Sequence, residues 1–82
     1  MLRFYFDLYD DLSSIPDEHG EVFATLGEAR EQAVAIVLDV LSEAHAFRPA
    51  RHGCRIRGEH GEAFCDVRVT LEVIAQQPSP AA

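Results

Sequence analysis

Two histidines and both cysteines of the chain are of the types that bind zinc: His52, Cys54, His60 and Cys65. Zinc takes tetrahedral sets of such ligands. Three of these side chains fit on one face of a predicted hairpin, but His60 falls in its turn, so four ligands do not converge. We therefore predict no metal site. Two free thiols that behave as small hydrophobic side chains are expected instead, because disulfides are rare in reducing compartments.

Oxygen ligands for a hard cation gather near the N-terminus, in Asp10, Asp11, Asp17, Glu18 and Glu21. Calcium loops require a fixed ligand spacing that this segment lacks. Runs of like charge are usually exposed faces, so we predict a solvated acidic loop.

No pattern for catalysis stands out. A covalent or acid–base mechanism needs a nucleophile, a base and an orienting group placed together, usually in a pocket. The chain shows no Ser-His-Asp or paired-carboxylate pattern, and Cys65 is predicted to point into the core. One helix on a small sheet also offers little concavity. We predict that the protein is not an enzyme and carries no cofactor.

Arginine and aromatic side chains form the main surface pattern. All seven basic residues are Arg, and four of them fall on predicted strands. The predicted solvent face of the sheet carries Arg3, Tyr5, Tyr9, Arg55, Arg57, Phe64 and Arg68. Such side chains stack on bases and contact phosphates, bind a protein, or pair across strands with Asp7, Asp66 and Glu72. The net charge of −7 disfavours nucleic acid relative to self-association or a protein partner.

Strand patterns at the two ends of the chain must position these residues. In residues 2–9 and 62–74 apolar and polar side chains alternate, as in a sheet with one buried face. Residues 10–14 are typical of a loop, and residues 16–20 have the Pro, Asp and Gly of a turn. A short edge strand is predicted at residues 21–23.

A single helix is predicted between these patterns. Thr25 and Glu28 fit the capping box, in which the Thr25 side chain accepts from a backbone N–H group of the first turn and the Glu28 side chain reaches back to the cap. The helix should end at about residue 46, because the residue before Pro49 is displaced from helical geometry. One apolar stripe would cover the sheet, formed by Leu26, Ala29, Ala33, Ile36, Val37, Val40, Ala44 and Phe47.

The second hairpin is predicted to contain strands at residues 54–57 and from residue 62 onward, joined by a turn at residues 58–61. With Arg57 opposite Glu62, Cys54 would face Cys65 on the buried side. The fold class is therefore α+β: a ββαββ chain with a four-stranded antiparallel sheet and one helix packed on one face. Residues 1–75 form a single domain, and residues 76–82 a disordered tail.

The small size of the chain has consequences for its assembly and location. A domain of 82 residues buries only about 60–65% of the surface of its unfolded chain, so association is a common source of stability. A second apolar row on the helix, Val34, Leu38 and Leu41, either packs under the loop at residues 48–53 or forms a homodimer interface, which we favour. No signal peptide or membrane-spanning run is recognisable, so we expect a cytoplasmic protein outside the membrane.

Four segments together resemble a known family: residues 3–8 (RFYFDL), residues 16–20 (PDEHG), Leu26-x-x-Ala29-Arg30-x-x-Ala33, and residues 67–73 (VRVTLEV). It is a family of very small proteobacterial proteins recorded only as a domain of unknown function. The resemblance covers about residues 3–73 and departs at residues 9–11, where members often carry His, Asp and Gly. It implies the fold but no catalytic residues.

A shorter segment, Thr25-Leu26-Gly27-Glu28-Ala29, is similar to the helix start of HicB-type antitoxins, although the DNA-binding module that these often append is missing. We therefore predict a small interaction or regulatory protein that binds another protein through its sheet face or edge. The alternative is an antitoxin-like or RNA-contacting module that uses the Arg and aromatic side chains.

Overall fold

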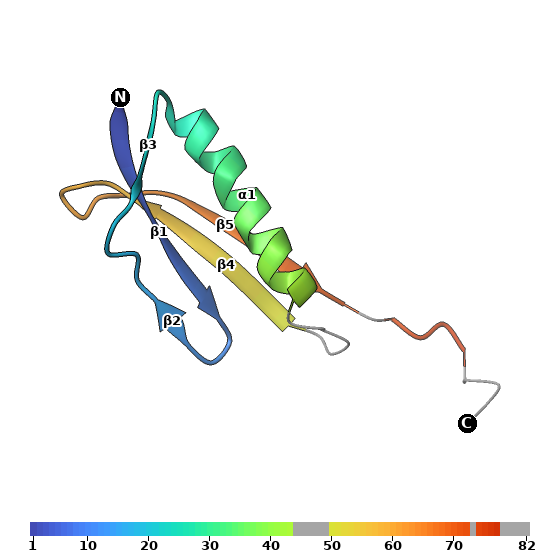
Figure 1. Cartoon of the computed structure of the whole chain (residues 1–82). Helices are drawn as coiled ribbons and strands as arrows, with labels where there is room; N and C mark the ends of the chain where they lie inside the picture. Colours follow the sequence, from blue (N-terminus) through green and yellow to red (C-terminus); the bar gives the residue numbers. More distant parts are fainter. Residues whose placement is uncertain (44–49, 73, 78–82) are drawn as a thin grey trace.

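The computed structural model describes residues 1–43, 50–72 and 74–77. Within these residues one helix packs against one face of an open antiparallel sheet, which confirms the α+β class (Figure 1). Several predictions concern positions outside the described residues: the helix end at residues 44–46, the stripe members Ala44 and Phe47, the loop at residues 48–49, Val73 and the last five residues of the tail.

The sheet is built around the first strand, β1 (Leu2–Asp10). On one side β1 pairs with β4 (Ala50–Arg57), which pairs in turn with β5 (Ala63–Leu71). On its other side β1 pairs with β3 (Glu21–Phe23) near its start and with β2 (Ser14–Ile15) near its end. β2 and β3 therefore lie one after the other along the same edge of β1, separated by residues 16–20. The predicted loop missed β2, because two residues are too few to show an alternating pattern.

The second hairpin differs from its predicted register. β4 begins four residues earlier than predicted, and Cys54 lies opposite Val67 rather than opposite Cys65. Both thiols are free. Arg57 pairs with Ala63 instead of Glu62, because the register shifts between Ile56 and Arg57.

The register shift also moves Phe64 off the predicted solvent face. Ile56 is opposite Cys65 and Arg57 is opposite Ala63, which leaves Phe64 as an extra residue between the two pairs. Its ring meets Phe4 edge to face, with the centroids 6.0 Å apart. Since Phe4 belongs to the core, Phe64 covers one end of the core and takes no part in the arginine-bearing face.

The helix α1 (Leu26–Glu43) begins as predicted. The N–H group of Glu28 donates to Thr25 Oγ1 at 3.2 Å, and the Glu28 carboxylate accepts from the N–H group of Ala24 at 3.2 Å. The reciprocal bond therefore reaches one residue before the cap.

None of the helices in the described residues has the length and apolar character needed to cross a membrane.

Alternation along the strands and the helical stripe produce the core. The buried hydrophobic side chains come from β1, α1 and β4, and they are Phe4, Phe6, Ala29, Ala33, Val37, Cys54 and Ile56. Ala29 and Ala33 let the helix approach the sheet closely. The helix covers only one face, so the opposite side chains of β1, β4 and β5 have no layer over them in the described part of the chain.

Candidate functional site

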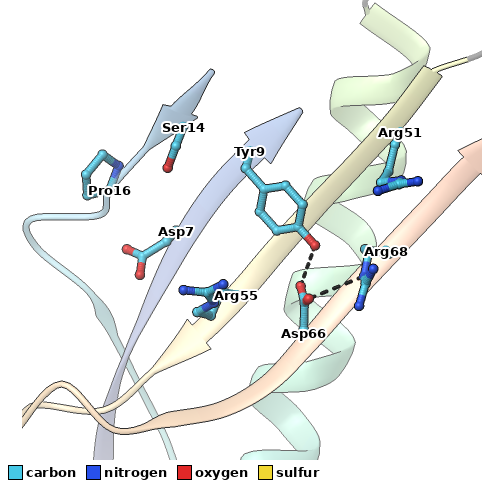
Figure 2. A pocket seen from close by; sticks show the side chains of 8 residues that line it. All are labelled: Asp7, Tyr9, Ser14, Pro16, Arg51, Arg55, Asp66 and Arg68. Atoms are coloured by element: carbon cyan, nitrogen blue, oxygen red, sulfur yellow. Dashed lines mark hydrogen bonds and ion pairs between the residues drawn. The ribbon is translucent and has the colours of Figure 1, made fainter. Parts of the chain in front are cut away.

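The uncovered sheet face carries an open pocket of about 580 Å³ (Figure 2). All its lining residues but Pro16 have polar or charged side chains, and they come from four strands and the segment after β2: Asp7, Tyr9, Ser14, Pro16, Arg51, Arg55, Asp66 and Arg68. These side chains stand on the same face because alternate residues of a strand point to the same side. The pocket is therefore a direct product of the strand register.

Tyr9 crosses the sheet at the side of this pocket. Its hydroxyl donates to Asp66 Oδ1 at 2.6 Å, so the ring bridges from β1 to β5 over the intervening strand (Figure 2). The residue beneath the ring is Gly53, and a Cβ built there would overlap the ring directly. Burial first, and then the bond to the Asp66 carboxylate, raise the pKa of Tyr9 above its ordinary value. Tyr9 is thus held neutral and fixed in place.

Two arginines of the face are already paired. The Arg57 guanidinium binds both oxygens of Asp7, with Nε at 2.8 Å and Nη2 at 3.2 Å, and it also lies 4.7 Å from the centroid of Tyr5. The hydrogen bond from Arg57 is the largest cause of the lowered pKa of Asp7, and it raises the pKa of Arg57. Arg68 Nε lies 3.3 Å from Asp66 Oδ2. The Arg57–Asp7 pair crosses from β4 to β1, as predicted, whereas the Arg68–Asp66 pair lies within β5 rather than across strands.

Two other arginines of this face remain available to bind a ligand. Arg51 and Arg55 are exposed on the same face of β4, and among the described residues no hydrogen bond or ion pair engages either guanidinium. Arg55 stands between Asp7 and Asp66 in the register, but both carboxylates are bonded to other groups. The face can therefore bind an anion through two guanidinium groups, which suit planar carboxylates and phosphates.

The acidic segment beside the pocket is structural. Asp17 occupies the gap between β2 and β3, where its Oδ2 accepts the Phe6 N–H at 3.0 Å in place of a strand partner. Its Oδ1 accepts the N–H groups of His19 and Gly20, and its own N–H donates to Asp7 at 2.9 Å. Burial raises the pKa of Asp17, but the three N–H donors outweigh that effect and lower it overall. Asp17 is therefore an ionised bridge rather than a solvated side chain.

The zinc-type residues do not form a site. Among the residues that the structure describes, no group of three or more His, Cys, Asp or Glu side chains could hold a metal. His52 and Cys54 are buried under the helix, and burial raises the pKa of Cys54 to about 12, which makes it a poor nucleophile at neutral pH.

The structure brings together only part of the predicted surface set. Tyr9, Arg55 and Arg68 line the pocket, and Tyr5 with Arg57 continues the same face. Arg3 is held at the far end, where it donates to the His19 carbonyl at 2.9 Å, and Phe64 is half-exposed with its ring against Phe4. Of the pocket residues that the prediction missed, Arg51 has a sequence signal. It stands four residues before Arg55 and shares its face once β4 is extended.

The fold and this face define a class of protein: a small α+β domain with one helix on one side of an antiparallel sheet and a charged, open surface on the other. The chain belongs to the family described as Domain of unknown function (DUF6894), which matches residues 3–70. This confirms the predicted membership of a family of unknown function. No curated protein and no protein of solved structure matches the chain.

Proposed function

We propose that this chain is a small, non-enzymatic binding protein of the cytoplasm, and that its uncovered sheet face holds an acidic segment of a partner protein. The single observation that carries this proposal is the pair of unengaged guanidinium groups, Arg51 and Arg55, beside an open polar pocket. Their neighbours Arg57 and Arg68 are neutralised by carboxylates of the chain. The free thiols suit a reducing compartment.

The same geometry weighs against the RNA-contacting alternative. Binding to single-stranded nucleic acid relies on exposed aromatic rings that stack on bases. Here Arg57 covers Tyr5, Tyr9 lies against Gly53 with its hydroxyl bonded, and Phe64, although 48% exposed, lies against Phe4 outside the pocket. The net charge of −7 also repels a chain that carries a phosphate at every nucleotide. A peptide with a few carboxylates meets less repulsion.

Fluorescence anisotropy tests the proposal with three probes: a labelled Glu-rich peptide, the same peptide with Gln in place of Glu, and a single-stranded RNA 12-mer. We expect salt-sensitive binding of the Glu-rich peptide only. The double variant Arg51→Gln/Arg55→Gln should weaken it by at least about tenfold, since charge-assisted hydrogen bonds are worth about 1.5–3 kcal/mol each.

The matched control is Arg30→Gln, which removes one exposed arginine from the helix and should leave binding unchanged. Equal affinity for the Glu and Gln peptides would overturn the proposal, and so would full binding by the double variant. Preference for the RNA would instead support the nucleic-acid alternative.

A further inference from the structure

The outer edge of β5 is the longest unpaired strand edge in the described part of the chain. β5 has nine residues and pairs only with β4, whereas the opposite edge of the sheet consists of the two- and three-residue strands β2 and β3. Exposed edges invite pairing with another strand, and proteins usually block them with proline, lysine or inward charges. Between residues 65 and 71 β5 has none of these, its bulge at Phe64 lies near its start, and its residues on the helix side are Cys65, Val67 and Val69.

We propose that this edge binds a second copy of the chain, so that two β5 strands pair antiparallel about a two-fold axis at Val67. Val67 is the midpoint of Ala63–Leu71, so this register pairs the regular residues 65–69 with their copy and leaves the bulge at Phe64 outside that segment. It places Val67 opposite itself and Cys65 opposite Val69 of the second copy. The apolar sides of both sheets thereby remain on the helix side.

The charges on β5 select the same register. With the axis at Val67, Asp66 lies opposite Arg68 of the second copy, and the pairing occurs twice. An axis at Asp66 or at Arg68 would instead place identical charges opposite each other, which destabilises a strand pair. Within one chain Arg68 Nε lies 3.3 Å from Asp66 Oδ2 and the Arg68 side chain is 57% exposed, so Arg68 can turn to Asp66 of the second copy while Asp66 Oδ1 keeps its bond to Tyr9.

The helix adds an apolar contact to the same interface. Val34 is 40% exposed and comes directly after the buried residue Ala33. Leu38 is 50% exposed and comes directly after the buried residue Val37. The helix joins the parallel strands β3 and β4, and such crossovers are right-handed. One residue advances a right-handed helix by 100°, so these side chains face the β5 side rather than the β1 side. Edge pairing therefore brings the rows Val34, Leu38 and Leu41 of two helices toward each other.

Assembly about this axis would also enlarge the candidate binding face. Asp66 and Arg68 belong both to the pocket and to the proposed edge contact. The two pockets would then adjoin on one continuous sheet, with Arg51 and Arg55 of both copies facing the same side.

Sedimentation equilibrium on the full chain tests the interface. The wild type should have twice the monomer mass of 9.1 kDa at micromolar concentration. Arg68→Asp or Asp66→Arg alone should raise the dimer dissociation constant by about tenfold or more, because each places like charges opposite each other. The double variant Asp66→Arg/Arg68→Asp should recover most of the affinity, because it restores opposite charges across the axis. A folding defect would not be rescued in this way.

A second variant, Leu38→Glu, should also weaken the dimer while its circular dichroism spectrum stays that of a folded chain. Leu12→Glu is the control, since Leu12 is 96% exposed in a loop far along the sequence from both contact rows. A monomeric wild type at about 100 µM would overturn the interface, as would a double variant no tighter than its single variants. Because peptide binding depends on Arg51 and Arg55, failure of the dimer and failure of the proposed function give separate results.

Discussion

Asp17 shows how one side chain can replace a piece of a strand. β1 is continuous, but its neighbours β2 and β3 leave a gap opposite Phe6. A backbone N–H without a partner at a part-buried position costs about 1–3 kcal/mol, and the Asp17 carboxylate supplies the missing acceptor. Gly20, with φ at +71°, allows the chain to turn back into β3 immediately afterwards. The PDEHG segment is therefore part of the sheet architecture.

Replacement of this carboxylate should produce a pH-dependent loss of stability. Asp17→Asn should lower the free energy of unfolding by about 1–3 kcal/mol at pH 7. The pKa of Asp17 is lowered in the folded state, so its contribution is complete above the unfolded value of about 4 and is lost as the pH falls through the folded pKa. The difference between the two proteins should shrink below about pH 3 to 4. Urea unfolding across this range measures it.

Asp39→Asn, on the exposed side of the helix, is the matched control and should show no such difference. An equal loss for Asp17→Asn at pH 7 and at pH 3 would show that shape rather than charge matters at this position.

The two cysteines should differ sharply in reactivity. Cys54 is fully buried and burial raises its pKa to about 12, whereas Cys65 is only half-buried. In the monomer, iodoacetamide at pH 8 should therefore modify Cys65 at least about tenfold faster, because only an accessible thiolate reacts. Peptide mass spectrometry of samples quenched over time measures both rates, and urea should make them similar. Comparable rates in the native protein would contradict the burial of Cys54.

At the scale of the elements, β4 depends on an aromatic cover supplied by β1. Glycine usually weakens a strand because it has no side chain to pack and much conformational freedom to lose. Tyr9 compensates for this at Gly53 by lying over the glycine and bonding to Asp66 on the next strand. This ring ties three strands together on a face without a covering layer.

Gly53→Ala should destabilise the protein through this ring. The added methyl group occupies the place of the Tyr9 ring, and forced overpacking costs about 1–3 kcal/mol. In a Tyr9→Ala background the cost should fall to less than half, which a double-mutant cycle by thermal or urea unfolding measures. Gly27→Ala is the control, because its nearest contact is at 3.7 Å and alanine favours helices, so that variant should be neutral or more stable. Additive effects of Gly53 and Tyr9 would contradict the contact.

At the scale of the whole molecule, the sequence predicted the elements that carry long periodic patterns. β1, β5 and the helix show four or more alternating or helically spaced apolar residues, and the capping box marks the start of the helix. The prediction failed where a distant residue decides the structure. Residues 51–53 contain a glycine and were predicted as part of a loop, yet they belong to β4, where the Tyr9 ring covers Gly53. The register shift at Phe64 likewise depends on packing against Phe4.

The sequence predicted several residues of the candidate site, but it did not show which of its arginines lack an ion-pair partner. Strand alternation placed Tyr9, Arg55 and Arg68 on one face, and the structure agrees. Which guanidinium groups are free depends on register and on loop geometry, since Arg57 is held jointly by Asp7 and the Asp17 carbonyl. The availability of Arg51 and Arg55 could therefore be read only from the assembled sheet.

The stability of the whole domain should be sensitive to very small changes at the centre of its sheet. Ile56 is completely buried and lies between Phe6 on β1 and Cys65 on β5, beneath the helix. Ile56→Val removes one methylene group and should lower the free energy of unfolding by about 0.5–1.5 kcal/mol, measured by urea unfolding at one fixed protein concentration. Leu12→Ala removes more apolar atoms from a 96% exposed side chain and should change stability by less than about 0.5 kcal/mol. A loss for Ile56→Val no larger than that control would mean that the sheet centre is not the packed core of the molecule.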